Sequence, residues 1–372
     1  MEKSHPVDSP ERLATIDISH QSKTSTRDSP LYQKCISYQE PLINYSIASK
    51  FPGLFSDSAR KKLSSPALEH STIIYWLSQL HCDQKLTKLH GSFDNSFENA
   101  CNKCIQFGLS VRDNIFYQRL VPFHDWLLSI PLKKVSPINF SYAFYRNLLA
   151  FNLFRAGFED KAILDTIQFR IKQVYQFVIQ NRYEIYVSPD QYPTMPKNFQ
   201  KQRLVDPALF EDGMSIFPNI HDLMVFQAYY VNTSSDKEKS MIDRIIQYCV
   251  SPQYTTQIDK GYGVMFVPPR TFYGIGWSVH LIKQNELLLY SFYQLFQAFQ
   301  NSFSGKNLCQ QYDSLQNSDG DYLLPIELLQ EKTGYYVSGS HMGMGVNRRK
   351  KNWRVIESDY WMLVSQNPSA NQ

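Results

Sequence analysis

The chain has 372 residues and a formal net charge of +4; 43% of its residues are hydrophobic, 19% charged and 14% aromatic. These values describe a globular chain that can bury a large core, in one large domain or two ordinary ones. They argue against a nucleic-acid binder, which needs a wide basic stripe, because the one dense basic cluster is the short run 348–351 with Arg354.

The start of the chain and its cysteines indicate the compartment. Residues 1–17 hold no apolar signal segment, and no stretch approaches the roughly 20 apolar residues of a membrane span. Six cysteines are few for this length and fit reduced thiols. We expect a cytoplasmic protein with no membrane span and no cofactor. The 24 Tyr and 24 Phe fit either a large aromatic-lined cavity or a biased genome.

The N-terminal segments are poor in large apolar groups. Residues 1–30 cannot bury enough surface to offset the chain entropy, so we predict a disordered tail. Residues 31–62 are predicted to form an irregular lead-in, and residues 63–368 one helical domain.

Apolar residues then recur at helical spacing. Ile73, Trp76, Leu77 and Leu80 form one helix face. Further on, Asn95 followed by Glu98 resembles a capping box at the start of a helix that runs to about residue 109.

From residue 139 onward, helices that are apolar nearly all round alternate with helices that are apolar on one face. The first kind is predicted at 139–158, 220–230 and 287–303, and the second at 160–180 and 236–249. A final short helix is predicted at 354–364. Strand alternation is limited to 183–187. The pattern predicts an all-α fold, an α/α toroid in which inner helices are enclosed and outer helices face water.

Four segments carry a resemblance to known proteins: 89–92 with the helix that follows, 273–281, 334–345 and 353–363. Together they resemble a group of uncharacterised bacterial proteins that are similar to the α/α-toroid superfamily of terpenoid cyclases and protein prenyltransferases, over roughly residues 65–365. The resemblance implies the toroid fold. It leaves the chemistry open, because Asp319-Gly320-Asp321 lacks the spacing of the cyclase Asp-rich motif and no Asp, Cys and His zinc set can be placed.

Three short motifs invite a metal interpretation. Cys101 and Cys104 fall on an apolar stripe, which favours buried thiols over ligands. The dipeptides His124-Asp125 and His221-Asp222 lack the additional ligands that metal-dependent phosphohydrolases need. The second dipeptide also suits a helix cap, because an acidic group favours the first turn. We predict no metal site.

The segments 260–281 and 334–357 combine glycines with aromatic and polar residues, and we expect them to meet at one opening of the ring. The candidate catalytic residues are His280, His341 and Glu357. The candidate substrate-binding residues are Arg270, Tyr273, Trp277, Tyr335 and Arg354. In the alternative interpretation, Trp277 and Trp361 anchor loops to the body and Glu357 pairs with an arginine.

Three functions stay open at this point. The first is an enzyme that acts on an apolar or isoprenoid-like substrate in a central aromatic-lined cavity. The second is a glycan-processing enzyme in which His, Tyr and a carboxylate transfer protons. The third is a non-catalytic binding or scaffold protein. The expected partner is an apolar small molecule or a glycan, not nucleic acid. The sequence decides neither catalysis nor oligomeric state.

Overall fold

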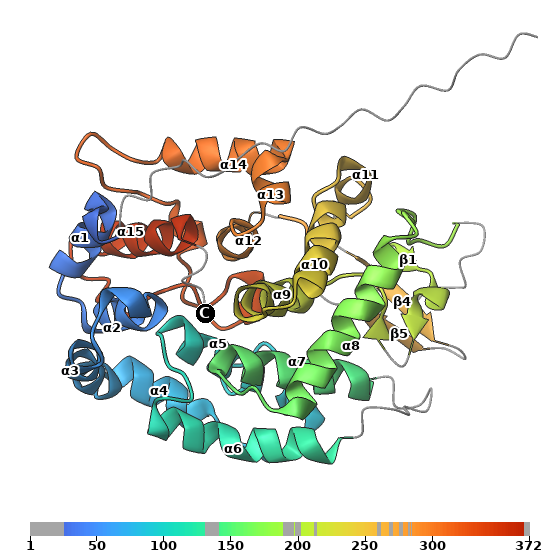
Figure 1. Ribbon diagram of the computed structural model, residues 1–372, viewed down its shortest axis with the longest axis horizontal. Coiled ribbons are helices and arrows are strands. Elements are labelled where there is room, and N and C mark those ends of the chain that lie inside the picture. The colour runs from blue at the N-terminus through green and yellow to red at the C-terminus, as the bar shows by residue number, and fades with distance from the viewer. Residues whose placement is uncertain are drawn as a thin grey trace, which may run out of the picture.

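The fold is predominantly helical. The computed structural model describes residues 26–130, 141–188, 197, 202–211, 214–258, 262–267, 271–274, 278–281, 283 and 285–367. Helix accounts for 62% of the structure and strand for 4%, which confirms the all-α prediction. Figure 1 shows the helices packed around one another, with the few strands at one side.

The N-terminal part corrects one expectation, because the segment 31–62 is not irregular. It contains helical structure along most of its length, in α1 Pro30–Ser37, α2 Pro41–Lys50 and the first half of α3 Asp57–Leu68. Proline at the first position starts both α1 and α2, where its missing N–H costs nothing. Burial against the rest of the body then stabilises α2, whose Leu42, Ile43 and Ile47 are almost fully buried. The predicted tail lies mostly outside the described residues.

The next helices are α4 Ser71–Gln79, α5 Phe97–Gln106 and α6 Asn114–Ser129. All ten residues of α5 are buried, including its polar ones. The N-cap of α5 is Ser96, not Asn95 as the sequence suggested, and Glu98 is not part of a capping box. Its carboxylate contacts two histidines instead.

The middle of the chain follows the predicted alternation. Its helices are α7 Ser141–Ala156, α8 Lys161–Val178, α9 Ile220–Asn232, α10 Asp236–Cys249 and the short α11 Pro252–Thr255. Asp160 caps α8, and Asn219 caps α9 in a capping box with Asp222. The prediction of a capping role for Asp222 is therefore confirmed.

Short strands lie between the helices. They are β1 Leu204–Val205, β2 Phe210–Glu211, β3 Met214–Ser215, β4 Val264–Val267 and β5 Thr271–Gly274. The sheet order β1-β4-β5 pairs β1 parallel to β4 and β4 antiparallel to β5, while β2 pairs with β3. The segment predicted as a strand contributes the single bridge Tyr186–Val205.

The C-terminal helices are α12 Glu286–Tyr293, α13 Gln297–Asn301, α14 Phe303–Asp313 and α15 Trp353–Gln366. The helix predicted over 287–303 is thus broken into α12 and α13. The last ten residues of α15 before Gln366 are all buried, so α15 is as enclosed as α5.

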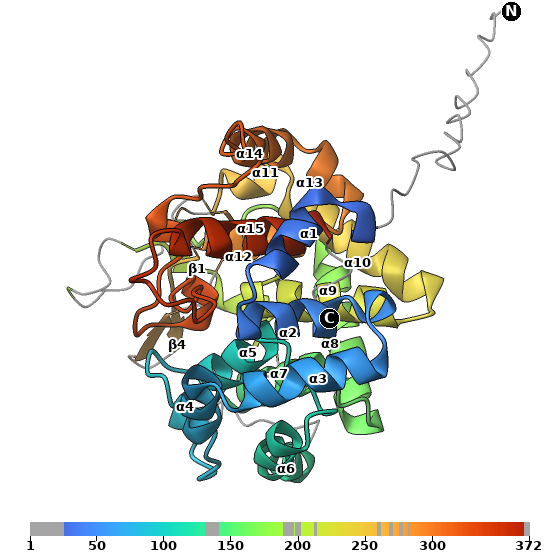
Figure 2. The same ribbon diagram turned by 90° about the vertical axis from the view of Figure 1, so that its left-hand side faces the viewer.

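Packing connects the enclosed helices in series: α5 contacts α7, α7 contacts α9, α9 contacts α12, and α12 contacts α15. The one-faced helices lie against this series, with α6 and α8 on α7 and α10 on α8 and α9. Figures 1 and 2 agree in placing α14 and α6 at opposite extremes of the molecule. Within the described part of the chain, no helix has the length and apolar character needed to cross a membrane.

Candidate functional site

A buried carboxylate joins two histidines near the start of α5 and α9. Nδ1 of His90 lies 2.5 Å from Oε2 of Glu98. Nε2 of His221 lies 2.9 Å from Oε1 of the same carboxylate. Glu98 is fully buried and His221 is 5% exposed, whereas the side chain of His90 is 22% exposed. One carboxylate therefore fixes two imidazoles, one of which reaches solvent.

Three separate segments supply this cluster. Glu98 is the second residue of α5, His221 is the second residue of α9, and His90 belongs to the loop before α5. The loop is held by Asn99, whose amide donates to the carbonyl oxygens of Gly91 and Phe93. Because the sites of attachment are on rigid helices and an anchored loop, the geometry of the cluster is fixed by the fold.

Aromatic rings enclose the two imidazoles. The ring of Phe144, near the start of α7, lies 5.3 Å from that of His90 and 5.5 Å from that of His221. The ring of Tyr335 lies 4.9 Å from that of His90. Tyr335 is one of the residues predicted to bind substrate, and the structure brings it to this cluster. The walls limit access of water and strengthen the electrostatic interactions inside.

The charge of Glu98 follows from its partners. Burial on its own raises the pKa of this carboxyl, but His90 and His221 outweigh that effect through charge and hydrogen bonds and hold the pKa below its usual range. An ionised carboxylate only accepts hydrogen bonds, so the nitrogens that face it carry the hydrogens. Each imidazole then presents its other nitrogen away from Glu98.

In His221, this second nitrogen has no hydrogen-bond partner among the described residues. It is Nδ1, a buried atom. Buried polar atoms are nearly always satisfied, and leaving one unpaired costs about 1–3 kcal/mol. An unpaired imidazole nitrogen beside a partly exposed histidine is therefore a candidate for contact with a ligand or a reacting proton.

The same three side chains can also hold a metal ion. Among the described residues, His90, Glu98 and His221 form a group whose ligand atoms all lie within 4.8 Å of one another. Two imidazoles and one carboxylate are a common ligand set for catalytic zinc, which keeps a further position open. In that state, the nitrogens that now face Glu98 would lose their hydrogens to become ligands.

Polar groups continue inward from the cluster. The amide of Asn102, one turn after Glu98, donates to the backbone oxygen of Glu98 and to Oδ1 of Asn152. Arg155, in the last turn of α7, donates to Oδ1 of Asn102. The interior next to the cluster is thus polar and positively charged, not a dry apolar chamber.

His341 and Glu357, both predicted to be catalytic, line a different cavity of about 710 Å³. The buried ammonium of Lys103 donates to Oε2 of Glu331 at 2.9 Å and to the backbone oxygen of His341 at 2.8 Å. Burial raises the pKa of Glu331, but Lys103 and His341 outweigh it and lower the pKa to about 2. Burial raises the pKa of Glu357 to about 7, despite the N–H of Met344 and the charge of Arg348.

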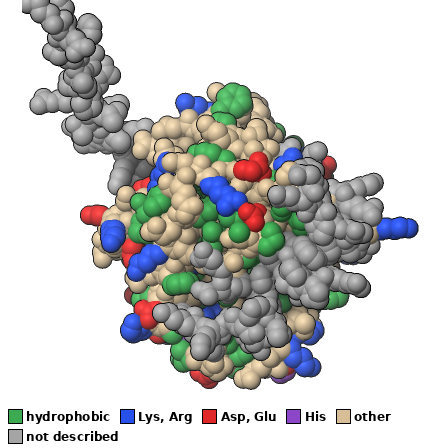
Figure 3. All heavy atoms as spheres, turned by 90° about the vertical axis from the view of Figure 1, so that its right-hand side faces the viewer, with side chains coloured by type: hydrophobic (Ala, Val, Ile, Leu, Met, Phe, Trp, Pro, Cys, Tyr) green, Lys and Arg blue, Asp and Glu red, His purple; other side chains and the backbone are tan. Residues whose placement is uncertain are grey.

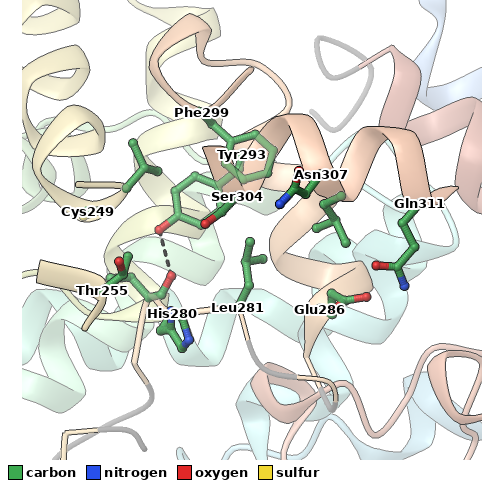
Figure 4. A pocket seen from close by; sticks show the side chains of 13 residues that line it. Cys249, Thr255, His280, Leu281, Glu286, Tyr293, Phe299, Ser304, Asn307 and Gln311 are labelled. Atoms are coloured by element: carbon green, nitrogen blue, oxygen red, sulfur yellow. Dashed lines mark hydrogen bonds between the residues drawn. The ribbon is translucent and has the colours of Figure 1, made fainter. Parts of the chain in front are cut away.

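His280, the third predicted catalytic residue, lines another cavity of about 210 Å³. Figure 4 shows Leu281 between His280 and Glu286, and Tyr293 donating a hydrogen bond to the backbone oxygen of Val279 at 2.8 Å. The two segments therefore do not bring His280 and His341 to one opening. His280 lies in the cavity lined by α12 and α14 residues such as Glu286 and Leu308, whereas Glu331 and His341 are held against α5 by Lys103.

The other predicted substrate-binding residues either form contacts away from the cluster or are not among the residues that the structure describes. Arg270 and Trp277 are not among the described residues. The backbone of Tyr273 pairs with Met265 in the β4–β5 hairpin. The guanidinium of Arg354 donates to the backbone oxygens of Leu324 at 2.7 Å and Leu323 at 3.4 Å, which is a role in holding a loop.

The predicted buried thiols are confirmed. Cys101 and Cys104 are free and fully buried in α5. Burial raises the pKa of Cys101 to about 12 and that of Cys104 well above its usual value. Neither thiol is poised to ionise and act as a nucleophile or ligand.

No protein-family model matches the chain, and neither a curated protein nor a solved structure is similar to it. On the face that carries the strands, Figure 3 shows Lys and Arg among Asp and Glu for the side chains that the structure describes.

The sequence did not single out His90, Glu98 and His221 as a group. Glu98 sits 123 positions from its partner His221, and its spacing from Asn95 resembled a cap. A usable signal was present, because His90 shortly precedes one enclosed helix and His221 begins another. Only the packing of α5, α7 and α9 shows that the three starts meet.

Proposed function

We propose that the protein is an α/α-toroid enzyme that transfers protons on a polar substrate at the His90–Glu98–His221 cluster, with glycans the first substrate class to test. The observation that carries the proposal is one buried carboxylate that fixes two imidazoles, while Nδ1 of His221 has no hydrogen-bond partner among the described residues. A positioned histidine near neutral pH is the usual general acid or base, and it contributes about 10²–10⁴-fold to a rate.

The ring arrangement is supported by the way the series of helices returns on itself. From α5 the contacts pass through α7, α9 and α12 to α15. Ser46 of α2 then joins the two ends, because its hydroxyl lies 2.8 Å from the hydroxyl of Tyr360 in α15 and donates to the backbone oxygen of Gln106 in α5 at 2.9 Å. The enclosed helices would form the inner layer, with α4, α6, α8 and α10 outside.

The roles within the cluster follow from charge. Glu98 has both oxygens occupied and stays ionised, so it positions the imidazoles and stabilises a positive charge on either of them. His221 and His90 are the groups that would exchange a proton with substrate, and Tyr335 would pack against it. Glycosidases that use a carboxylic acid with a second carboxylate fit less well, because Glu98 is held away from the protonated form.

A polar substrate fits better than an isoprenoid. The cavity of about 710 Å³ does not include the cluster, but it is held against the same helix, α5, and is lined by charged side chains such as Lys103, Glu331 and Arg348. A smaller cavity lies among the enclosed helices and is also lined by cations. A cavity that binds an isoprenoid would need apolar walls, because burying charged side chains against a hydrocarbon is unfavourable.

The test is turnover of a panel of oligosaccharides, including uronate-containing ones, with products identified by mass spectrometry. We expect His221→Gln to lower turnover by about 10²-fold or more. His124→Gln is the matched control, since His124 of α6 also pairs with a carboxylate, Asp160 at 2.7 Å, in a separate contact at the start of α8. Full activity of His221→Gln, or no product from any member of the panel, would contradict the proposal.

A metal-dependent enzyme is the second candidate, and the compact ligand set favours it. The two candidates separate on dialysis against a chelator. Proton transfer by free imidazoles survives dialysis, whereas a zinc enzyme loses activity and regains it when zinc is returned. Zinc analysis of His221→Gln and His124→Gln then shows whether any bound metal belongs to this cluster.

A further inference from the structure

A small cavity among the enclosed helices is lined by two cations. Its volume is about 20 Å³, and Lys50 and Arg155 both face it. The remaining lining is neutral: Ile105, Gln106, Leu288, Ser291, Phe292, Tyr336, Tyr360, Trp361 and Val364. A cavity of this volume holds a single particle of about the size of water.

Among the described residues, none of opposite charge acts on the side chain of Lys50. It is the last residue of α2 and is 7% exposed. No hydrogen bond or ion pair joins its ammonium to a described residue, and the charged group that acts on it is another cation, Arg155. The carbonyl end of α2 gives some stabilisation, because cations are favoured at helix C-termini. A partial helix charge does not replace a counter-ion.

Arg155 is also incompletely paired. Its guanidinium donates to Asn102 and interacts with the hydroxyl of Tyr336, but its Nε atom is buried without a partner. The carboxylate that acts on Arg155 is Glu98, which is already bound by two histidines. Among the described groups, no carboxylate acts on Lys50, and the one that acts on Arg155 is already bound elsewhere.

We propose that the cavity between Lys50 and Arg155 binds one monatomic anion, with chloride as the ligand. Nε of Arg155 is buried and has no partner among the described residues, the ammonium of Lys50 forms no hydrogen bond with them, and Tyr336 and Tyr360 line the same space. Sulfate and phosphate are too large for about 20 Å³. The inference is independent of the proposed catalysis at the His90–Glu98–His221 cluster.

Affinity for the anion should depend on pH in a defined direction. Without an anion, burial and then Arg155 lower the pKa of Lys50 to about 7. The other titratable groups that face it are Tyr336 and Tyr360, whose pKa values burial raises, so both stay neutral. A bound anion stabilises the protonated lysine, so binding is tighter below pH 7 than at pH 9.

Crystals soaked in bromide give the direct test on the unmodified protein. We expect an anomalous scattering peak between Lys50 and Arg155. A cavity that holds a water molecule gives density there without an anomalous signal, and that result would overturn the proposal.

Thermal unfolding gives the second test. At pH 6.5, sodium chloride or bromide should raise the Tm by about 2 °C above sodium gluconate of equal ionic strength, in a saturable way. The rise should shrink at pH 9 and vanish in Lys50→Met. Lys161→Met, which removes an exposed lysine, should keep it. Equal effects of gluconate and halide, or a halide effect that persists in Lys50→Met, would reject the site; should Lys50→Met not fold, the bromide peak decides.

Discussion

His221 and Asp222 are consecutive residues in the first turn of α9, and each forms a buried contact with a distant charged residue. Asp222 pairs with Arg170 of α8, and His221 pairs with Glu98 of α5. The two contacts differ in how completely their polar atoms are satisfied. That difference separates a structural ion pair from a candidate reactive site.

The Arg170–Asp222 pair is complete. Nε and Nη2 of Arg170 donate to the two oxygens of Asp222 at 2.8 and 2.7 Å. Its remaining hydrogens reach Gln173 and the backbone oxygens of Ser215 and Phe217. Both side chains are fully buried. Such a network has no free atom to offer a ligand, and it fixes α8, α9 and the preceding loop relative to one another.

The Glu98 cluster is incomplete by the same measure. Both carboxylate oxygens are satisfied, yet Nδ1 of His221 is buried and no residue that the structure describes forms a hydrogen bond with it. The fold satisfies the polar atoms of Asp222 but leaves Nδ1 of the adjacent His221 available for a ligand. Unpaired buried groups persist where function repays their cost.

The largest expected effect breaks the complete network. Arg170→Met leaves the carboxylate of Asp222 buried without its counter-ion, so we expect a loss of about 3–5 kcal/mol in the free energy of unfolding. Chemical denaturation measures it. Lys161→Met is the control, because it removes an exposed pair with Asp165 worth about 0.5 kcal/mol or less. Similar losses in the two variants would show that Arg170 is not a structural anchor.

An intermediate effect concerns the open network. Glu98→Gln puts an amide against two imidazoles that both donate, so one contact is lost, and we expect a loss of about 2–3 kcal/mol. A double-mutant cycle with His221→Gln should give a coupling above about 1 kcal/mol, because the two side chains are in contact. Coupling with His124→Gln should be near zero. An additive result for Glu98 and His221 would remove the basis of the cluster.

The smallest expected effect is a pH dependence of stability caused by a third buried carboxylate, that of Glu357. Glu357 accepts the N–H of Met344 at 2.8 Å and faces Arg348 at 3.3 Å, and burial raises its pKa to about 7. The folded state keeps a proton that the unfolded state releases near pH 4.5. Stability should therefore fall by about 1–2 kcal/mol as the pH rises from 4.5 to 7.

Glu357→Gln should flatten that dependence over the same interval, as measured by urea denaturation at a series of pH values. The residue stays in place and keeps an oxygen for the N–H of Met344, so the comparison isolates the charge. A slope that is unchanged in Glu357→Gln would assign the pH dependence to other carboxyls.

Local pattern was enough for much of the helical fold. The bounds of α10, Asp236–Cys249, agree with the predicted range, because its apolar stripe repeats with the period of a helix and Ser235 caps its start. The burial of Cys101 and Cys104 could be predicted in the same way, because both lie on the apolar face of their helix. The lead-in 31–62 was misjudged because the stability of α2 comes from burial on the body, not from its own composition.

The candidate site required the tertiary structure. Tyr335 was named from its glycine- and aromatic-rich surroundings, and it does lie against His90. The spacing of Glu98 from Asn95 predicts a helix cap because such spacing shows only which residues are neighbours along one helix. Its actual partner His221 is 123 positions away.

Most helices and the burial of their apolar stripes could therefore be predicted from the residue pattern, since both depend on interactions within a few residues. Which carboxylate meets which histidine, and which nitrogen is left over, was decided only when the starts of α5, α7 and α9 packed together. Burial is what leaves a polar atom unpaired, because in water each of these atoms would form a hydrogen bond with solvent.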